Sequence, residues 1–292
     1  MATGIIPIDK PQGWTSQDVT ARLRRVFATR RIGHGGTLDP MATGVLPVFV
    51  GRATRAVEFF EHAGKEYVAT LHLGLVTDTQ DITGAVRQER DVHVSRAELE
   101  SVLPQFRGNI SQIPPMYSAI KVDGRKLYEL ARQGKEVARS PREVTIHALE
   151  LLEFDGREAK IRVDCSKGTY IRTLCHDIGM ALGCGGCMAS LRRTRAGSYR
   201  IEQAIALEEL LERAERQEPV EQLLLPIDSM FQSIPAWNAS PSQEKKCRNG
   251  APFLARTAAG TYRIYGADGE FLALGRCDGQ EMATIKSFFE VT

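Results

Sequence analysis

Asp39 lies in a loop of unusual composition, and its residue type and setting make it the first candidate for chemistry. It stands between Leu38 and Pro40 in the segment 33–51, GHGGTLDPMATGVLPVFVG. Ordering a chain rich in glycine and threonine costs conformational entropy, so a rigid loop of this kind is expected to position a reactive group. A carboxylate there could act as a nucleophile or a base. The residues alone leave a second interpretation open, because Asp-Pro pairs commonly start turns.

Other common kinds of site find little support. The sequence contains no G-x-x-x-x-G-K-[ST] loop and no G-x-G-x-x-G between a strand and a helix, which disfavours phosphate cradling and dinucleotide binding. Cys184 and Cys187 form a C-x-x-C pair, but a structural zinc site needs two further cysteine or histidine ligands, so we expect no metal and an incidental pair. The six cysteines are expected to be reduced thiols of a cytoplasmic protein.

Basic charge is concentrated in the first two thirds of the chain. Residues 1–201 carry 29 Lys and Arg against 22 Asp and Glu, residues 202–234 carry 2 against 8, and residues 235–292 carry 7 against 6. The basic residues cluster in RLRRVFATRR (22–31) and LRRTRAGSYR (191–200). This distribution favours a polyanionic partner, although a solvated helix face would look the same. No apolar run is long enough to predict a membrane span, and no signal peptide is expected.

The elements that must position Asp39 can be predicted from periodicity. Thr15 and Asp18 predict the start of an amphipathic helix with a basic outer face, and alternation predicts a half-buried strand from Tyr67 to Leu73. Segment 33–51 is expected to be an ordered loop leading into a short strand. Further helices are predicted after Ser95, within 125–134 and within 169–183, and strands within 144–154 and 159–166. This order of elements favours an α+β fold over a doubly wound sheet.

The chain is long enough for about two domains. The acidic stretch 202–224 is helical by composition, and prolines follow it at 226, 235 and 241. Beyond them, TYRIYGADGEFLALGRC predicts a β-hairpin around ADGE. We therefore expect one domain over residues 1–230 and a small β-rich domain over residues 235–292.

Five blocks of the sequence, taken together and in order, resemble the bacterial tRNA pseudouridine-55 synthases. They are IDKPQGWTS, GHGGTLDPMATGVLPVFVGRATR, KEYVATLHLGLVTDTQDITG, IPPMYSAIKVDGRKLYELAR and CSKGTYIRTLCHDIG, and the resemblance runs from about Gly4 to Leu191. It implies a mixed, mainly antiparallel catalytic sheet and the isomerisation of uridine 55 in the T-loop of tRNA to pseudouridine, without a cofactor or metal. More loosely, residues 235–292 resemble the small RNA-binding PUA domain that this family often carries.

The resemblance also assigns the catalytic residues. The family's catalytic aspartate corresponds to Asp39, and the arginine of GTYIR, here Arg172, would keep that carboxylate ionised in a pocket that excludes water. Tyr67 matches a tyrosine that stacks on the extruded base, and Tyr170 matches an active-site tyrosine. Whether Asp39 attacks the base, attacks the sugar or abstracts a proton stays open.

The residues expected to bind substrate are His34, Leu191, Lys10, Arg192 and Arg193. By resemblance the histidine lies near the flipped nucleotide and the leucine forms an apolar wall of the pocket. The lysine could reach phosphates or brace the site, and the two arginines belong to a basic cluster that would add salt-dependent affinity for RNA. One departure from the family is the glycine that follows the histidine, where many relatives carry threonine.

Two other functions stay open at this point. The same scaffold could bind or fold tRNA without catalysis, although an intact set of Asp39, Tyr67, Tyr170 and Arg172 disfavours this. A hydrolase of glycosidic bonds would need a second carboxylate as acid or base, and the sequence singles none out. The expected partner is the T-arm of tRNA, with no membrane and no obligatory protein partner.

Overall fold

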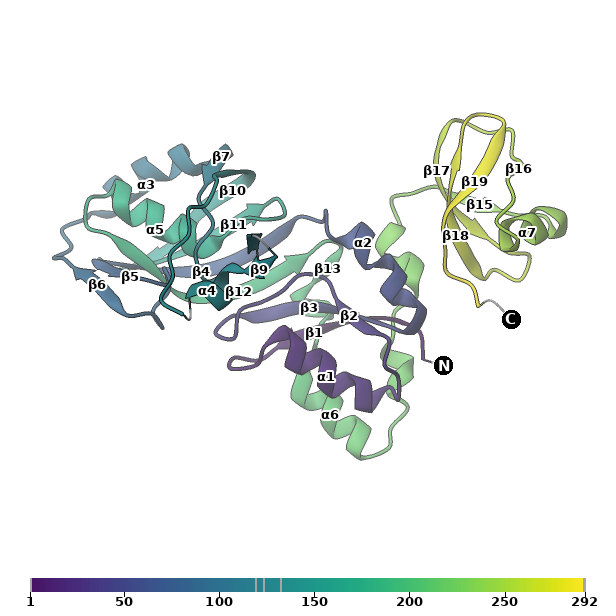
Figure 1. Cartoon of the computed structure of the whole chain (residues 1–292), viewed down its shortest axis with the longest axis horizontal. Helices are drawn as coiled ribbons and strands as arrows, with labels where there is room; N and C mark the ends of the chain where they lie inside the picture. The colour runs from purple at the N-terminus through teal and green to yellow at the C-terminus, as the bar shows by residue number, and fades with distance from the viewer. Residues whose placement is uncertain (1, 119, 123, 132, 291–292) are drawn as a thin grey trace.

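A computed structural model of the chain describes residues 2–118, 120–122, 124–131 and 133–290. Two separate sheets dominate these residues (Figure 1). The order of elements is α+β, as predicted, and the larger sheet is mainly antiparallel. Among the described residues no helix combines the length and the apolar character needed to cross a membrane.

The larger sheet has ten strands in the described part of the chain, with a main path β14-β1-β3-β12-β4-β11-β10-β7. Only two of its pairings are parallel, β1 with β14 and β3 with β12. The strands are β1 (Gly4–Lys10), β2 (Ile32–His34), β3 (Thr43–Val50), β4 (Lys65–Leu73), β7 (Gly108–Gln112), β10 (Arg142–Phe154), β11 (Glu158–Cys165), β12 (Gly186–Ala196), β13 (Tyr199–Arg200) and β14 (Ile205–Ala206). Two short ribbons pair β5 (Leu75–Thr77) with β6 (Val86–Glu89), and β8 (Lys121–Val122) with β9 (Arg125–Lys126).

Seven α-helices lie within the described residues: α1 (Ser16–Val26), α2 (Val57–Phe60), α3 (Arg96–Val102), α4 (Leu127–Ala131), α5 (Ile171–Ala181), α6 (Leu207–Glu215) and α7 (Pro241–Arg248). The 3-10 turns are η1 (Gly51–Ala56), η2 (Leu103–Phe106), η3 (Ile201–Gln203), η4 (Val220–Leu223) and η5 (Ile227–Phe231). The helix predicted within 202–224 is only partly present. It ends at Glu215 because Gln217 takes a left-handed φ of 59° and Pro219 follows.

Local sequence signals explain the elements that carry the site. The Thr15 hydroxyl accepts from the Asp18 amide, and the Asp18 carboxylate accepts in return from the Thr15 amide, which confirms the predicted capping box of α1. In β4 every second residue is buried, namely Tyr67, Ala69, Leu71 and Leu73, as the alternation predicts. Segment 33–51 contains more strand than predicted, because β2 pairs with β3 and β3 runs to Val50.

The smaller sheet stands at one end of the molecule in Figure 1. Its strand order is β15-β17-β18-β19-β16, from β15 (Ala236–Asn238), β16 (Phe253–Leu254), β17 (Gly260–Tyr265), β18 (Phe271–Cys277) and β19 (Glu281–Ser287). Antiparallel β17 and β18 form the predicted hairpin. Phe231 packs against Phe271 and Phe288, and Lys286 pairs with Glu58 at 2.6 Å, so apolar and ionic contacts both join this sheet to the rest of the chain. Its assignment to the PUA type stays a prediction.

Candidate active site

A cavity of about 1310 Å³ opens between segments that are far apart in the sequence. The loop after β2, the start of β4, the turn before β6, the segment before α4, the turn before α5 and strand β12 all contribute to its wall. Seven of the nine predicted site residues line it: His34, Asp39, Tyr67, Tyr170, Arg172, Leu191 and Arg193. Lys10 and Arg192 do not.

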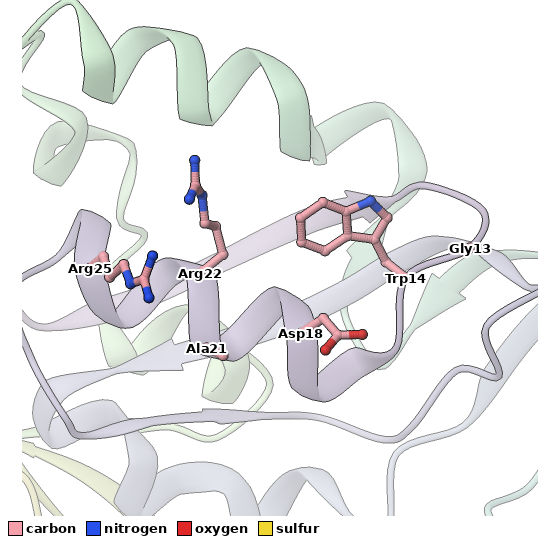
Figure 2. Close-up of a pocket in the computed structure, with 6 residues that line it drawn as sticks. All are labelled: Gly13, Trp14, Asp18, Ala21, Arg22 and Arg25. Carbon is pink, nitrogen blue, oxygen red and sulfur yellow. The ribbon is translucent and has the colours of Figure 1, made fainter.

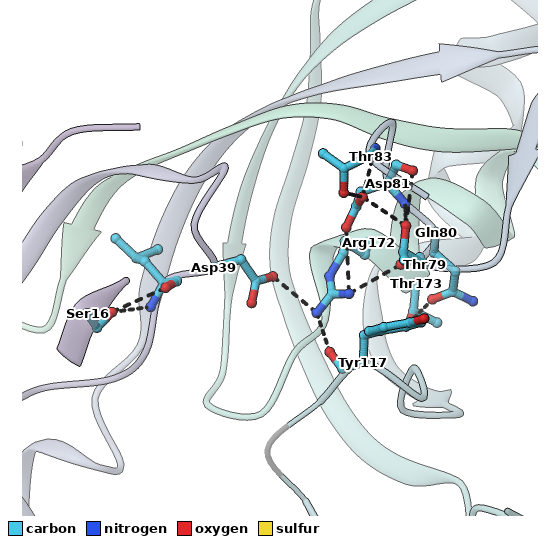
Figure 3. Close-up of polar contacts among 10 residues, drawn as sticks. Ser16, Asp39, Thr79, Gln80, Asp81, Thr83, Tyr117, Arg172 and Thr173 are labelled. Atoms are coloured by element: carbon cyan, nitrogen blue, oxygen red, sulfur yellow. Dashed lines mark hydrogen bonds and ion pairs between the residues drawn. The ribbon is translucent and has the colours of Figure 1, made fainter. Parts of the chain in front are cut away.

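The loop that carries Asp39 is fastened to the first helix. The Ser16 hydroxyl accepts from the Leu38 amide at 2.9 Å and donates to the Leu38 carbonyl at 3.2 Å, and Ser16 itself is buried. On the other side, the Ala42 amide donates to the Asp39 carbonyl at 3.0 Å. Because the backbone is fixed on both sides, the Asp39 side chain points into the cavity from a rigid base (Figure 3).

Asp39 and Arg172 form an ion pair at the centre of the cavity. Arg172 Nη2 lies 3.1 Å from Asp39 Oδ2, and the two side chains are 7% and 39% exposed. The guanidinium also donates to the Thr79 carbonyl at 3.2 Å and to the Tyr117 carbonyl at 2.8 Å (Figure 3). A buried, immobile cation thus holds a carboxylate that is still open to the cavity.

Gln112 places the segment that carries the arginine. Its side chain is buried, accepts from the Tyr170 amide at 3.0 Å and donates to the Tyr170 carbonyl at 3.2 Å. The side-chain amide of Gln112 therefore makes with residue 170 the pair of hydrogen bonds that a neighbouring β-strand would make. This contact lies where α5 begins. This fixes the direction in which Tyr170 and Arg172 leave the backbone.

Asp81 is a second carboxylate on the same arginine, and no spacing in the sequence singles it out. Its Oδ2 lies 3.7 Å from Arg172 Nη1, and both side chains are 7% exposed. Its other oxygen accepts from the Thr79 hydroxyl at 2.9 Å and from the amide and hydroxyl of Thr83 at 3.0 and 2.6 Å. Asp81 therefore orients the guanidinium from behind while Asp39 faces the cavity.

Replacing Asp81 by asparagine should reduce turnover while leaving the fold in place. Asparagine keeps the size of the side chain and an acceptor for Thr83, but it removes the charge that holds Arg172 in position. Displacing a positioning group by about 1 Å can cost up to about 10²-fold in rate, and we expect a loss of kcat of that order. Single-turnover kinetics would measure it, and an unchanged rate would show that the other three contacts of Arg172 suffice.

The two predicted tyrosines and the predicted leucine line the cavity as expected. Tyr67 is 8% exposed and Leu191 is 9% exposed, on the neighbouring strands β4 and β12. Burial raises the pKa of the Tyr67 phenol, and burial likewise raises the pKa of Tyr170. Both phenols are therefore neutral at pH 7 and offer aromatic faces and hydroxyl groups rather than charge.

His34 lies at the end of β2 and also lines the cavity. Burial, helped by the Arg193 charge, lowers the pKa of its imidazole, so the ring is neutral at pH 7. Its Nδ1 is buried and has no hydrogen-bond partner among the described residues. Lys65 lines the same cavity, and burial together with Arg193 lowers its pKa to about 8. This lysine begins the KEYVAT block, but nothing in the block assigns it a role.

Charged side chains are normally exposed to solvent, but Lys10 and Arg193 are almost completely buried. The Lys10 amine donates to the carbonyls of Pro11, Trp14 and Pro40 at 2.8, 2.6 and 3.4 Å. Of the two roles open to Lys10 the structure therefore favours bracing, since no free face is left for a phosphate. Arg193 is 1% exposed and donates to two backbone carbonyls, so it lines the cavity and has no exposed face for salt-dependent contacts with RNA.

Arg192, the residue before Arg193, does reach the surface. Its guanidinium makes two hydrogen bonds to the Asp9 carboxylate, at 2.7 and 3.2 Å, with the arginine side chain 43% exposed. Arg195 makes one hydrogen bond to the Asp164 carboxylate, at 2.8 Å. Arg192 and Arg195 are both paired with carboxylates already. This pairing reduces the electrostatic attraction that they can exert on RNA phosphates.

The burial of Lys10 makes stability depend on pH in a defined direction. Burial lowers its pKa from 10.5 to about 8, so between these values the unfolded chain binds more protons than the folded one. The free energy of unfolding contributed by Lys10 should therefore rise as pH increases from about 8 to 10.5. Urea denaturation of the wild type and of Lys10→Met at pH 7.5 and 10 measures this, and an equal difference at both pH values would contradict it.

Gly35 stands where many relatives of this chain carry threonine. An aromatic ring packs closely against this position. A Cβ at this position would lie 2.4 Å from Cδ1 of Phe60. Phe60 itself packs against Phe49 and Tyr199. The Phe60 ring thus fills the space that a threonine side chain would need. The glycine at this position is therefore explained by the packing of Phe60.

A second, shallower cavity of about 450 Å³ lies against the first helix, on the side facing α6 (Figure 2). Its wall includes Trp14, Asp18, Arg22 and Arg25. Arg22 faces Glu215 of α6 at 3.8 Å. None of the predicted catalytic residues contributes to it, so the chemistry belongs to the larger cavity.

Comparison with known proteins agrees with this site. The TruB family pseudouridylate synthase N-terminal domain matches residues 24–171, and the tRNA pseudouridylate synthase B C-terminal domain matches residues 172–232. The tRNA pseudouridine synthase B of Pseudomonas fluorescens is 47% identical over 277 residues, covering 94% of this chain and 91% of that protein. The tRNA pseudouridine synthase B of Syntrophomonas wolfei is 43% identical over 290 residues, covering 97% of this chain and 96% of that protein.

Solved structures extend the likeness to three dimensions. A chain in the structure of an H/ACA RNP bound to a substrate RNA containing 2'-deoxyuridine superimposes with a TM-score of 0.74 at 29% identity, covering 98% of this chain and 85% of that chain. Family models, relatives and fold point the same way, and this chain belongs to the TruB family of pseudouridylate synthases.

Proposed function

We propose that this protein converts a uridine of tRNA to pseudouridine, and that the uridine is position 55 of the T-loop. The observation that carries the proposal is the Asp39–Arg172 ion pair, an accessible carboxylate on a buried cation, inside a cavity of about 1310 Å³. Relatives at 43–47% identity named tRNA pseudouridine synthase B support the substrate and the reaction. We also propose that the protein acts in the cytoplasm and without an obligatory protein partner.

The reaction is an isomerisation whose atoms balance without a co-reactant. The bond between N1 of uracil and C1′ of ribose breaks, the ring turns over, and C5 forms the new bond to C1′. C5 loses its hydrogen, and N1 gains one. Asp39 is the group we assign to the breaking of the glycosidic bond, and Arg172 keeps its carboxylate in place and ionised.

The remaining cavity residues would bind the extruded nucleotide. Tyr67 offers a neutral aromatic face for stacking, which is worth roughly 1–3 kcal/mol per base. Leu191 on the neighbouring strand closes the apolar side, and Tyr170 and His34 add polar edges. Together they would replace the stacking that the uridine loses when it leaves the T-loop.

A hydrolase of glycosidic bonds is less well supported. Such an enzyme needs a second carboxylic group on the far side of the scissile bond, within about 10 Å of the first. Asp81 is 7% exposed and lies behind Arg172, where Thr79 and Thr83 occupy one of its oxygens. Although Asp81 contributes to the cavity wall, its other oxygen faces the guanidinium of Arg172, so neither oxygen is free to act as the second acid or base.

The direct test is the release of tritium from a T-arm stem-loop RNA labelled at C5 of its uridines. Only formation of the bond between C5 and C1′ requires that hydrogen to leave, so release reports the isomerisation itself. A second stem-loop, with cytidine at position 55 and the other uridines kept, checks the position. Release from both RNAs would contradict position 55, and binding without release from either would favour a protein that folds tRNA without chemistry.

A further inference from the structure

The Ser118 side chain is a buried hydroxyl in the wall of the active-site cavity that has no partner. Ser118 is 5% exposed, lines the same cavity as Asp39 and Arg172, and its Oγ makes no hydrogen bond within the described residues. Leaving a buried polar group unpaired costs free energy, so native proteins rarely keep one without a use. A ligand in the cavity would supply the missing partner.

The backbone around Ser118 is tied to the catalytic centre. The preceding residue, Tyr117, accepts a hydrogen bond from Arg172 through its carbonyl at 2.8 Å. The Ser118 carbonyl itself accepts from the Tyr128 amide at 3.1 Å. The hydroxyl therefore keeps a fixed position relative to the guanidinium that holds Asp39.

The Tyr170 phenol lies close to the Ser118 hydroxyl. Burial raises the pKa of Tyr170, and the interaction with Ser118 counteracts part of that rise. The two groups do not meet the geometry of a hydrogen bond, so the Ser118 oxygen is left without one. Two neutral hydroxyls thus stand side by side in the cavity wall, both able to donate.

The chemistry of the turnover explains why a hydroxyl suits this place. When uracil turns about the axis through N3 and C6, N1 exchanges with C5 and O2 exchanges with O4. A donor beside the ring edge therefore meets a carbonyl oxygen both before and after the turn. A serine hydroxyl rotates freely and can follow the small shift between the two orientations.

We propose that Ser118 Oγ donates a hydrogen bond to a carbonyl oxygen of the extruded uracil and holds the ring during turnover. The inference rests on the proposed function, because it requires uracil in the cavity. It adds a substrate-binding residue from the segment between β7 and α4. Ser118→Ala should lower kcat/KM by about tenfold, the usual effect of losing one hydrogen bond in a buried site.

A chemical double-mutant cycle separates this role from a structural one. Wild type and Ser118→Ala are each given T-arm stem-loops with uridine, 2-thiouridine or 4-thiouridine at position 55, labelled with tritium at C5. Sulfur accepts hydrogen bonds weakly, so one of the thio substitutions should lower the rate of tritium release by the wild type. In Ser118→Ala, which lacks the donor, the same thio substitution should change the rate by a factor near one. Equal factors in both proteins, for both thio substitutions, would overturn the proposal.

Matched variants complete the design. Ser190→Ala removes a hydroxyl that donates to Thr70 Oγ1 at 2.8 Å on the exposed face of the sheet, and it should leave all three rates unchanged. Should Ser118→Ala lower the melting temperature, the cycle is run with Ser118→Cys, whose thiol keeps the volume but is a weak donor. A wild type that releases no tritium from the uridine stem-loop refutes the proposed function instead, so the two failures are distinct.

Discussion

Asp39→Asn is expected to abolish pseudouridine formation while the protein still binds the T-arm stem-loop. Asparagine has nearly the same shape and keeps an oxygen that can accept from Arg172, so the cavity should survive the change. What it lacks is the negative charge and the nucleophilic oxygen. Deleting a reacting group typically costs on the order of 10⁴-fold or more in rate, and single-turnover tritium release would measure the loss.

The accompanying binding measurement decides what such a loss means. Asp39 is 39% exposed, Ala42 holds its carbonyl and Ser16 holds the backbone of the preceding Leu38, so the variant should fold and bind RNA within a few-fold of the wild type. A filter-binding or fluorescence titration at one fixed salt concentration checks this. Residual activity within about tenfold of the wild type would remove Asp39 from the chemistry, whatever its place in the cavity.

Arg172→Met is expected to damage both activity and stability. The guanidinium joins two carboxylates and two backbone carbonyls, and methionine satisfies none of them. Removing one partner of a buried ion pair costs about 3–5 kcal/mol, because Asp81 would be left charged and 7% exposed. Turnover should fall by about 10²–10³-fold, as when a single electrostatic contact to a reacting group is lost.

Combining Arg172→Met with Asp81→Asn separates the two effects. The double variant no longer buries an unpaired charge, so urea denaturation should show part of the lost stability restored. Activity should stay as low as in Arg172→Met, since Asp39 still lacks its cation. Recovery of activity together with stability would mean that the arginine serves the fold alone.

The elements around the site could be predicted because their signals are local. The capping box of Thr15 and Asp18 lies within one helical turn, and the alternation from Tyr67 to Leu73 records one buried face of one strand. Each pattern depends on neighbours only a few residues away. The position of Asp39 in a constrained loop followed from composition in the same way.

The partners within the site could not be predicted in this manner. Asp81 acts through an arginine 91 residues later in the chain, and no spacing links the two. Lys10 and Arg193 carry charges that composition assigns to the surface, yet backbone carbonyls solvate them inside the protein, and Pro40, Val45 and Gly36 supply carbonyls from far away in the sequence. Burial of a charge depends on which backbone groups converge on it, and a single sequence does not reveal that convergence.

Strand β12 lies between β3 and β4 in the larger sheet, although it follows both of them by more than a hundred residues. Gly44 of β3 meets it so closely that a Cβ would lie 2.2 Å from the Arg193 carbonyl oxygen. A nascent chain that has reached only Leu182 on the ribosome already carries Asp39, Tyr67 and Arg172, but the two halves of its sheet are still unjoined. The sheet that holds the site together can therefore be complete only after β12 has been synthesised.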